Sequence, residues 1–208
     1  MLSTPELSAL VRELALPLAG FAVVTSASPG PVNVIAATSG ANFGWSRTLP
    51  HVLGATLGFA CLILAMGFGL DSILRHTPWL HGALKVLGAS FLTYLAIKLW
   101  MARAGATIGA QLQRPPSARQ GLLAQWTNPK AWIVAASGIA TYTRTGDAYI
   151  PSVLLQCLVF SAICLPSIGA WALLGHAAKR LLASPKALHH FNASMAFLLL
   201  LSVIGVLF

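Results

Sequence analysis

Lys130 is the residue of this chain best placed to do chemistry, because it lies deep in the apolar run 122–140. An ammonium group near the middle of a membrane is costly, and no carboxylate in the sequence is obviously placed to pair with it. It must therefore find carbonyls, water or an anionic solute, or lose its proton. Lys130 is then either a binding residue for a solute carboxylate or a structural contact to carbonyls freed at another helix break.

Lys130 directly follows one of two places where an apolar run contains helix-breaking residues. The first is Pro29-Gly30-Pro31 and the second is Asn128-Pro129. Proline removes a backbone donor, and glycine permits turns that other residues resist. In hydrocarbon such a break must pack against protein or line a watered cavity. Both breaks are candidates for a substrate-binding site, unless they are ordinary proline kinks.

Asn33 lies in the first turn of the helical segment that Pro31 begins, a position where proline is favoured. The free amides of that turn and the positive end of the helix dipole would attract a carboxylate. Asn33 would add amide contacts to a bound solute. Alternatively, its side chain only satisfies backbone groups that the kink frees.

The two breaks occupy corresponding positions in the two halves of the chain. Aligning Pro31 with Pro129 also aligns Ser39-Gly40 with Ser137-Gly138, since each pair follows its proline at the same distance. Interrupted helices at matching positions of two repeats are typical of secondary transporters, whose site lies where the breaks meet. The alternative is that the Ser-Gly match arises by chance.

Composition places the chain in a membrane, because 57% of its residues are apolar and 8% are charged, against about a quarter charged in soluble domains. The net charge of +9 does not indicate nucleic acid, since the basic residues are scattered at the ends of apolar runs. Positive-inside loops and anionic lipid headgroups account for this excess.

We predict an all-α integral membrane protein with about six transmembrane helices, arranged as an inverted repeat of three and three with two broken helices. The first repeat would cover residues 1–102 and the second 121–208, joined by a basic loop at 103–120. The expected spans are residues 7–41, 50–70, 80–101, 121–142, 150–175 and 188–208. Gly54 and Gly58 in the second span would allow close helix packing.

Basic residues are distributed unevenly between alternate loops, which predicts that both termini are non-cytoplasmic. One side would hold Arg47, Arg103, Arg114, Arg119, Lys179, Arg180 and Lys186, and the other chiefly Arg12, Arg75 and Arg144.

The three cysteines, Cys61, Cys157 and Cys164, lie inside apolar runs without a CxxC or metal-binding spacing. We expect packed core thiols, no metal and no cofactor. A membrane thiol carrier on a similar inverted-repeat scaffold is the alternative function, but it would want a cysteine at each break. A structural subunit is a further alternative, and no hydrolase motif is present that would indicate an enzyme.

Several segments together resemble the LysE/RhtB family of amino-acid exporters over nearly the whole chain. They are Ser-Pro-Gly-Pro-x-Asn at 28–33, Thr-Pro-Trp-Leu at 77–80, the segments 84–89 and 94–100, and Gln-Trp-Thr-Asn-Pro-Lys-Ala-Trp at 125–132. The resemblance implies a bacterial inner-membrane exporter of amino acids, driven by the proton gradient. Two positions depart from the family pattern: Val32 replaces a frequent asparagine, and Phe59 stands where many members carry an aspartate.

With Phe59 in that position, other residues would have to carry the proton. His51, Asp71 and Asp147 are the candidates, although the histidine could be an interfacial anchor and the aspartates solvated turn residues. Trp126 and Trp132 flank the second break at a spacing that predicts different faces, where they would line the substrate path or pack in the core.

The shortage of acidic residues also indicates the cargo. A cationic side chain would want a buried carboxylate, so we expect a neutral or zwitterionic amino acid. Its carboxylate would lie near Lys130 and its ammonium on carbonyls exposed by the break at Pro29. The expected partners are this small solute and membrane lipid, with no nucleic acid and with a homodimer left open.

Overall fold

The computed structural model describes residues 3–70 and 114–178, together with isolated positions within 86–101 and 186–200. Asp71, most of the predicted loop 103–120 and most of the predicted spans 80–101 and 188–208 lie outside the described residues.

The two continuous described ranges are helical and contain no strand. Their elements are α1 (Thr4–Ala27), α2 (Pro31–Phe43), α3 (Trp45–Ala65), η1 (Met66–Leu70), α7 (Ala118–Trp126), α8 (Pro129–Tyr142), η2 (Gly146–Ala148) and α9 (Tyr149–Ala178). The all-α prediction is confirmed for this part of the chain, and both predicted interruptions are present, one between α1 and α2 and one between α7 and α8.

Local sequence explains where these helices begin. α1 and α7 start with capping boxes, in which Ser3 pairs with Glu6 and Ser117 with Gln120. α2 and α8 instead start with a proline at the first helical position, where its missing donor costs nothing. The chain therefore resumes a helix after each break at a proline, Pro31 in the first and Pro129 in the second.

Two predicted boundaries are wrong. α3 begins at Trp45 rather than at residue 50, with Pro50 inside the helix. Pro50 is exposed near the helix end, where water or lipid headgroups can bond the carbonyl that it leaves unpaired. α7 begins at Ala118, inside the segment predicted as a loop, because the capping box at Ser117 starts a helix there.

Among the described residues, three helical segments are long and apolar enough to cross a membrane: Thr4–Ala27, Trp45–Gly69 and Gly146–Ala178. Large apolar side chains also face outward from them, since Leu16 is 82% exposed and Val24 and Leu158 are each 69% exposed. In water such a surface would be a liability, whereas in hydrocarbon it is the expected exterior. The chain is therefore an integral membrane protein.

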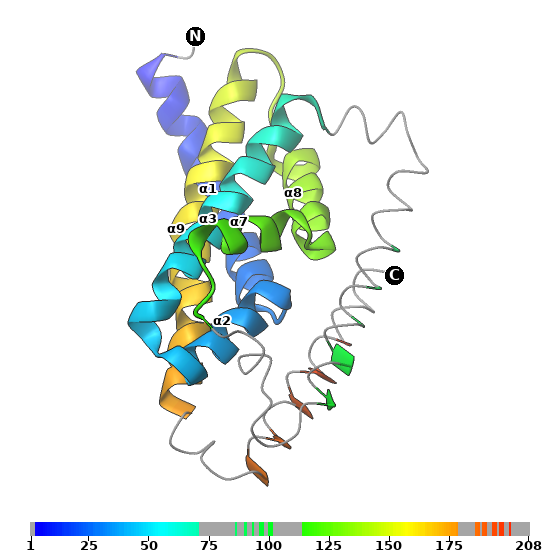
Figure 1. Cartoon of the computed structure of the whole chain (residues 1–208). Helices are drawn as coiled ribbons and strands as arrows, with labels where there is room; N and C mark the ends of the chain where they lie inside the picture. The colour runs from blue at the N-terminus through cyan, green and yellow to red at the C-terminus, as the bar shows by residue number, and fades with distance from the viewer. Residues whose placement is uncertain are drawn as a thin grey trace.

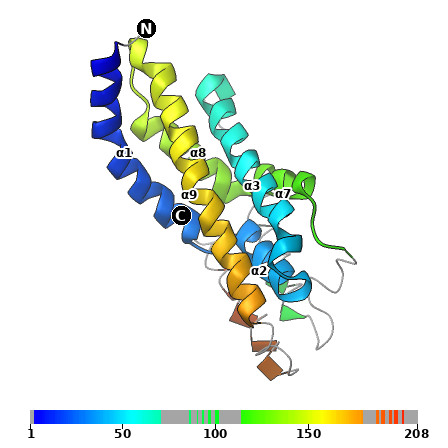
Figure 2. The same cartoon turned by 90° about the vertical axis from the view of Figure 1, so that its left-hand side faces the viewer.

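The half-helices α2 and α8 extend in opposite directions from the level at which the chain breaks. α9 lies between α1 and α3 and contacts both (Figure 2). α2 occupies the lower half of the molecule and α8 the upper half, while α7 lies across α3 (Figure 1). The first turns of α2 and α8 therefore both lie at mid-height.

Small residues let the helices approach closely at two crossings. A side-chain carbon added at Gly54 would overlap the backbone of Ala118 in α7, and one at Gly121 would overlap the backbone of His51 in α3. The predicted close packing of the Gly54 face is confirmed, with α7 as its partner. At the second crossing, Gly40 of α2 packs against the backbone of Ala172 in α9.

We predict that Gly54→Ala destabilises the protein, because its methyl group would meet backbone atoms that cannot move without separating α3 from α7. Overpacking of this kind costs about 1–3 kcal/mol. The matched control is Gly20→Ala in α1, where an added carbon would meet nothing within 4 Å. Thermal unfolding of the purified protein in detergent measures both. Equal melting temperatures for the two variants would show that the crossing is not tightly packed.

Candidate functional site

The two interruptions meet through the side chain of Lys130. Its Nζ donates to the backbone oxygen of Ser28 at 3.0 Å, to Oγ of Ser28 at 2.7 Å and to the backbone oxygen of Pro29 at 3.2 Å. An ammonium carries three donors, so these three acceptors match its full capacity. The carbonyls left unpaired where α1 ends are thus satisfied by a cation from the start of α8.

The sequence allowed two roles for Lys130, a binding residue for a solute carboxylate or a structural contact to carbonyls freed at the other break. In the structure its ammonium makes contacts of the second kind. The side chain is half-buried, and its stem passes over Gly30, whose added carbon would lie 3.5 Å from Cδ of Lys130. Gly30 itself has an extended backbone, with φ at −174°, so it is not required for an unusual turn. Pro31 and Pro129 are buried at the starts of α2 and α8.

Asn33 also holds the first interruption together. Its Nδ2 donates to the backbone oxygens of Ser26 at 2.8 Å and of Ser28 at 2.9 Å, and the residue is 5% exposed. The two hydrogens of the amide nitrogen are therefore engaged with the chain itself. The remaining polar atom of this side chain is Oδ1, an acceptor, which suits an ammonium group better than a carboxylate.

The two half-helices differ at their N-termini. In α8, Oδ1 of Asn128 accepts from the backbone nitrogen of Lys130 at 3.2 Å, and Nδ2 of Asn128 donates to Oε1 of Gln125 at the same distance. No side chain caps α2. Helix N-termini attract anions through exposed amides and the helix dipole. The start of α2 is therefore the more open of the two toward an anionic group.

A cavity of about 50 Å³ lies where the interruptions meet. Its polar lining comes from the ends of α1, α2, α7 and α8 and consists of Thr25, Ser26, Asn33, Gln125, Asn128 and Lys130. Its apolar lining comes mainly from α2, α3, α8 and α9 and consists of Val32, Phe59, Ala131, Val134, Phe160 and Ile168. Gly30 and Cys164 complete the lining. None of these residues is acidic, so the only charge among them is the ammonium of Lys130.

Phe59 and Phe160 form an aromatic pair in the lining. Their ring centroids lie 5.1 Å apart with an interplanar angle of 66°, and the residues are 4% and 1% exposed. Phe21 packs against Phe160 at 5.9 Å and against Tyr142 at 5.7 Å. The pair is thus held by further rings and keeps a fixed position.

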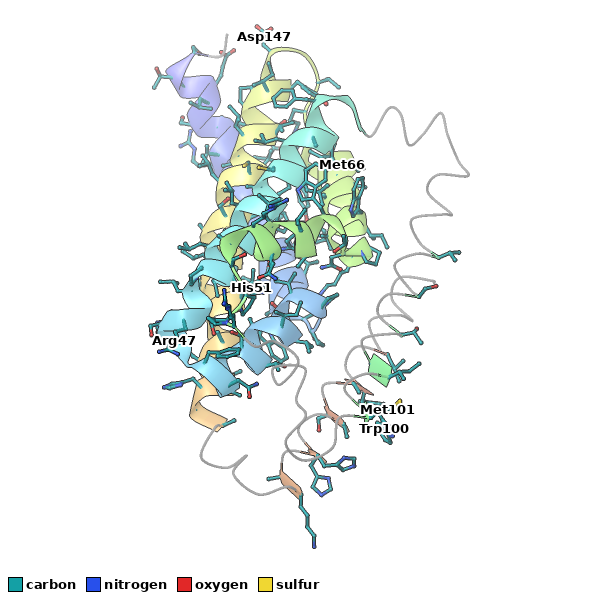
Figure 3. All side chains as sticks on the ribbon, in the orientation of Figure 1. Arg47, His51, Met66, Trp100, Met101 and Asp147 are labelled. Carbon is teal, nitrogen blue, oxygen red and sulfur yellow. The ribbon has the colours of Figure 1, made fainter. Side chains whose placement is uncertain are left out.

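The described candidates for a proton relay do not line the cavity. His51 is 1% exposed in α3, with Nε2 at 3.4 Å from the backbone oxygen of Val32, and its Nδ1 has no partner among the described residues. Asp147 is exposed in η2 at the end of the molecule that carries the N-terminus, and Arg47 lies toward the opposite end (Figure 3).

The prediction that Trp126 and Trp132 point to different faces is wrong. Their ring centroids lie 6.0 Å apart in an edge-to-face arrangement, and Nε1 of Trp132 donates to the backbone oxygen of Trp126 at 2.7 Å. The spacing rule assumes one continuous helix, whereas α7 ends at Trp126 and α8 starts at Pro129. The two indoles therefore pack across the second interruption as a structural pair.

Cys164 is the cysteine that reaches the cavity, where its Sγ lies 3.2 Å from Oγ of Ser26. Cys157 lies one heptad earlier on α9, with Sγ 3.9 Å from the backbone oxygen of Ala60. Both thiols are free, as is Cys61. Neither interruption contains a cysteine of its own.

Sequence reasoning missed several residues of this site. Ser28 supplies two of the three acceptors of Lys130, and its position beside Pro29 was the available signal. Gln125 opens the segment 125–132 that resembles the family, but sequence reasoning assigned it no role. In the structure it accepts a hydrogen bond from Asn128. Phe160 lies in a uniformly apolar helix, where nothing in the pattern marks it as a lining residue.

Three membrane-length helices among the described residues and a central cavity at two helix interruptions define a multi-pass membrane protein. The family model of the LysE type translocator matches residues 23–208, so the chain belongs to that family. The resemblance inferred from the sequence is confirmed.

The individual relatives match only part of this chain, at moderate sequence identity. An uncharacterized membrane protein of Vibrio cholerae is 30% identical over 113 residues, which cover 53% of this chain and 55% of that protein. One of Pseudomonas aeruginosa is 31% identical over 129 residues, 58% of this chain and 60% of that protein. The chain thus spans less than two thirds of the length of both.

A relative with a functional name is the cysteine/O-acetylserine efflux protein of Escherichia coli strain K12. It is 26% identical over 168 residues, which cover 77% of this chain and 82% of that protein. No solved structure matches the chain.

We predict that Asn33→Asp destabilises the protein, because it replaces two donated hydrogen bonds by a carboxylate facing the oxygens of Ser26 and Ser28. Leaving buried groups unpaired costs about 1–3 kcal/mol, and more when a group is charged. Asn42→Asp is the control, since Asn42 also donates within α2, to Thr38, but is only half-buried. Melting temperatures of purified variants compare them. An unchanged value for Asn33→Asp would contradict a structural role at this break.

Proposed function

We propose that this protein is a secondary transporter that exports amino acids or small amino-acid derivatives from the cytoplasm by alternating access. The observation that supports this most directly is the contact of Lys130 with Ser28 and Pro29 beside the central cavity. It places one cation, several polar side chains and two helix starts around a space suited to a small zwitterion. The efflux protein of Escherichia coli supports amino-acid derivatives as the cargo class.

The cargo carboxylate would bind at Lys130 and the open start of α2. The carbonyls of Ser28 and Pro29 hold the ammonium of Lys130 in the cargo-free site. A carboxylate competes well for it, because it adds an opposite charge to a hydrogen bond in which only the lysine is ionised. The cargo ammonium would bind acceptors of the first interruption, including Oδ1 of Asn33. Pro29, Gly30, Asn128 and the two helix-starting prolines, Pro31 and Pro129, would shape the site.

Alternating access would use an inverted repeat, with residues 1–102 as the first unit, 103–120 as the connection and 121–208 as the second unit. Contacts among the described helices support such a symmetry. α1 and α2 pack on α9, which belongs to the second unit, and α7 packs on α3, which belongs to the first. The opposite directions of α2 and α8 agree with this arrangement (Figure 1).

We place the protein in the bacterial inner membrane with both termini outside the cytoplasm. The N-terminal end of the molecule carries Glu13, paired with Arg144, and Asp147, while Arg47 lies toward the other end (Figure 3). The rule that cytoplasmic loops are rich in Lys and Arg supports this orientation through the basic residues that the sequence assigns to the same side as Arg47. Membrane lipid is the expected surroundings, and a homodimer is compatible with the large apolar exterior.

Proton coupling is the remaining part of the proposal. His51 is the described candidate that contacts the first interruption, because its ring lies against the backbone oxygen of Val32 in the first turn of α2. Asp147 would serve only at the non-cytoplasmic end, and Asp71 stays a candidate outside the described residues. A gradient-driven exporter would then link protonation of one of these groups to the position of α2.

We predict that Lys130→Met abolishes export while the protein still inserts. The loss of a charge-assisted contact to a cargo carboxylate should lower export at least about tenfold. Efflux of labelled amino acids from cells that overproduce the variant measures this, with Lys130→Arg as a variant that keeps the charge. Lys186→Met is the control, because Lys186 is exposed. Export by Lys130→Met at the wild-type rate would remove the carboxylate site from this proposal.

A membrane thiol carrier is the second candidate function, and the position of Cys164 at the cavity favours it. The exporter instead predicts that replacing Cys61 and Cys157 by alanine and Cys164 by serine leaves efflux within about twofold of wild type. None of the three has a hydrogen bond to Lys130 or Asn33 among the described contacts, and serine at position 164 can keep the bond to Oγ of Ser26. Efflux from cells carrying this cysteine-free variant decides between the two, since a redox carrier would lose all activity.

A further inference from the structure

The residues that line the cavity fall into two chemical groups. Those from the interruptions are polar and include Lys130, Asn33 and Gln125. Those from the long helices are apolar and include the ring pair Phe59 and Phe160. An amino acid has the same division, with charged groups on its α-carbon and a variable side chain. The polar group can serve every amino acid alike, so discrimination has to come from the apolar group.

We propose that Phe59, braced by Phe160, forms the pocket for the cargo side chain and selects amino acids whose side chains are small and uncharged. This assignment rests on the exporter function proposed above and specifies its substrate class. The two rings are buried, and Phe160 is also held by Phe21, so the wall cannot move aside easily.

A cationic cargo side chain is disfavoured because the described lining contains no carboxylate. An anionic one would compete with the cargo's own carboxylate for Lys130, the only cation of that lining. Among the described acidic residues, Glu6 lies in the first turn of α1, Glu13 lies within α1 and pairs with Arg144, and Asp147 lies in η2. None of them lines the cavity. A lysine or arginine cargo would have to desolvate its side-chain cation without a counter-ion. A cation–π contact with an aromatic face recovers only part of that cost. The positive charge of Lys130 would add repulsion at short range.

The size of the cargo side chain is limited by the volume of the cavity. A cavity of about 50 Å³ has room for only a few waters, at roughly 10–15 Å³ for each. Even alanine has more non-hydrogen atoms than this number of waters, so any cargo must widen the site, and a small side chain requires the least widening. Because the rings of Phe59 and Phe160 are edge to face at 5.1 Å, little space remains between them.

Position on α3 singles out Phe59 from its neighbours. Gly58 faces α7, where an added carbon would meet the backbone of Leu122, and Leu57 is 57% exposed on the lipid side. Three successive residues thus face three environments, and only Phe59 reaches the cavity. Leu57 is therefore a matched control on the same helix, two residues away.

The test is transport by the purified full chain in liposomes, with labelled alanine, leucine and lysine as separate cargoes. We expect the wild type to move alanine at least about tenfold faster than lysine, whose side-chain cation has no counter-ion in the described lining. Alanine should also move faster than leucine, since a pocket discriminates one methylene by about 10–200-fold. Phe59→Ala should enlarge the pocket and raise leucine transport relative to alanine at least about tenfold. Leu57→Ala should leave the order of the three cargoes unchanged.

The possible results distinguish a failure of the proposed side-chain selectivity from a failure of the proposed exporter function. Equal transport of alanine and lysine by the wild type would overturn the selectivity and leave the exporter standing. Transport of none of a full panel of amino acids would overturn both. If Phe59→Ala does not fold, Phe59→Leu tests the size limit instead. An unchanged leucine-to-alanine ratio in a folded Phe59 variant would show that another residue sets the specificity.

Discussion

The structure depends on satisfying the ammonium of Lys130 among apolar helices, with no carboxylate beside it in the described part of the chain. Lys130 meets that constraint with Ser28 and Pro29, whose oxygens are available only because α1 stops short of α2. Each interruption would be costly alone. The first would leave the carbonyls of Ser28 and Pro29 unpaired, and the second would leave the charge of Lys130 unpaired. Together they offset each other. That mutual dependence explains why two breaks far apart in the sequence lie side by side, and it leaves a polar cavity at their junction.

Close helix packing is what brings the breaks to the same place. Gly54 and Gly121 let the backbones of α3 and α7 touch, and Gly40 does the same for α2 and α9. Small residues are the usual means of close approach where lipid supplies no hydrophobic drive between helices. Each crossing positions one of the two half-helices. The crossing of α3 with α7 positions α8, which follows α7, and the crossing of α2 with α9 positions α2 itself. The close contacts at these two crossings therefore lie outside the cavity and fix the positions of the helices that line it.

Much of this arrangement was predictable from local chemistry. Proline and glycine within apolar runs mark the interruptions, and the lack of a partner for Lys130 pointed to carbonyls at the other break. The particular acceptor, Ser28, depends on how far the stem of Lys130 reaches over Gly30. That distance is set by packing and not by sequence pattern. The same holds for the pairs Phe59 with Phe160 and Trp126 with Trp132, which join positions that helical periodicity does not relate.

The occupied state of Lys130 has a consequence for the exporter proposed above. All three donors of its ammonium already have acceptors from the first interruption. A cargo carboxylate can bind only by replacing some of these contacts, which frees the end of α1 from the start of α8. A ligand shifts a conformational equilibrium only through different affinities for the two states. Here that difference is built into the binding contact itself, because the cargo and the closed interruption compete for one cation. Release of the cargo would return Ser28 and Pro29 to Lys130, so binding and movement would be coupled without a separate sensor.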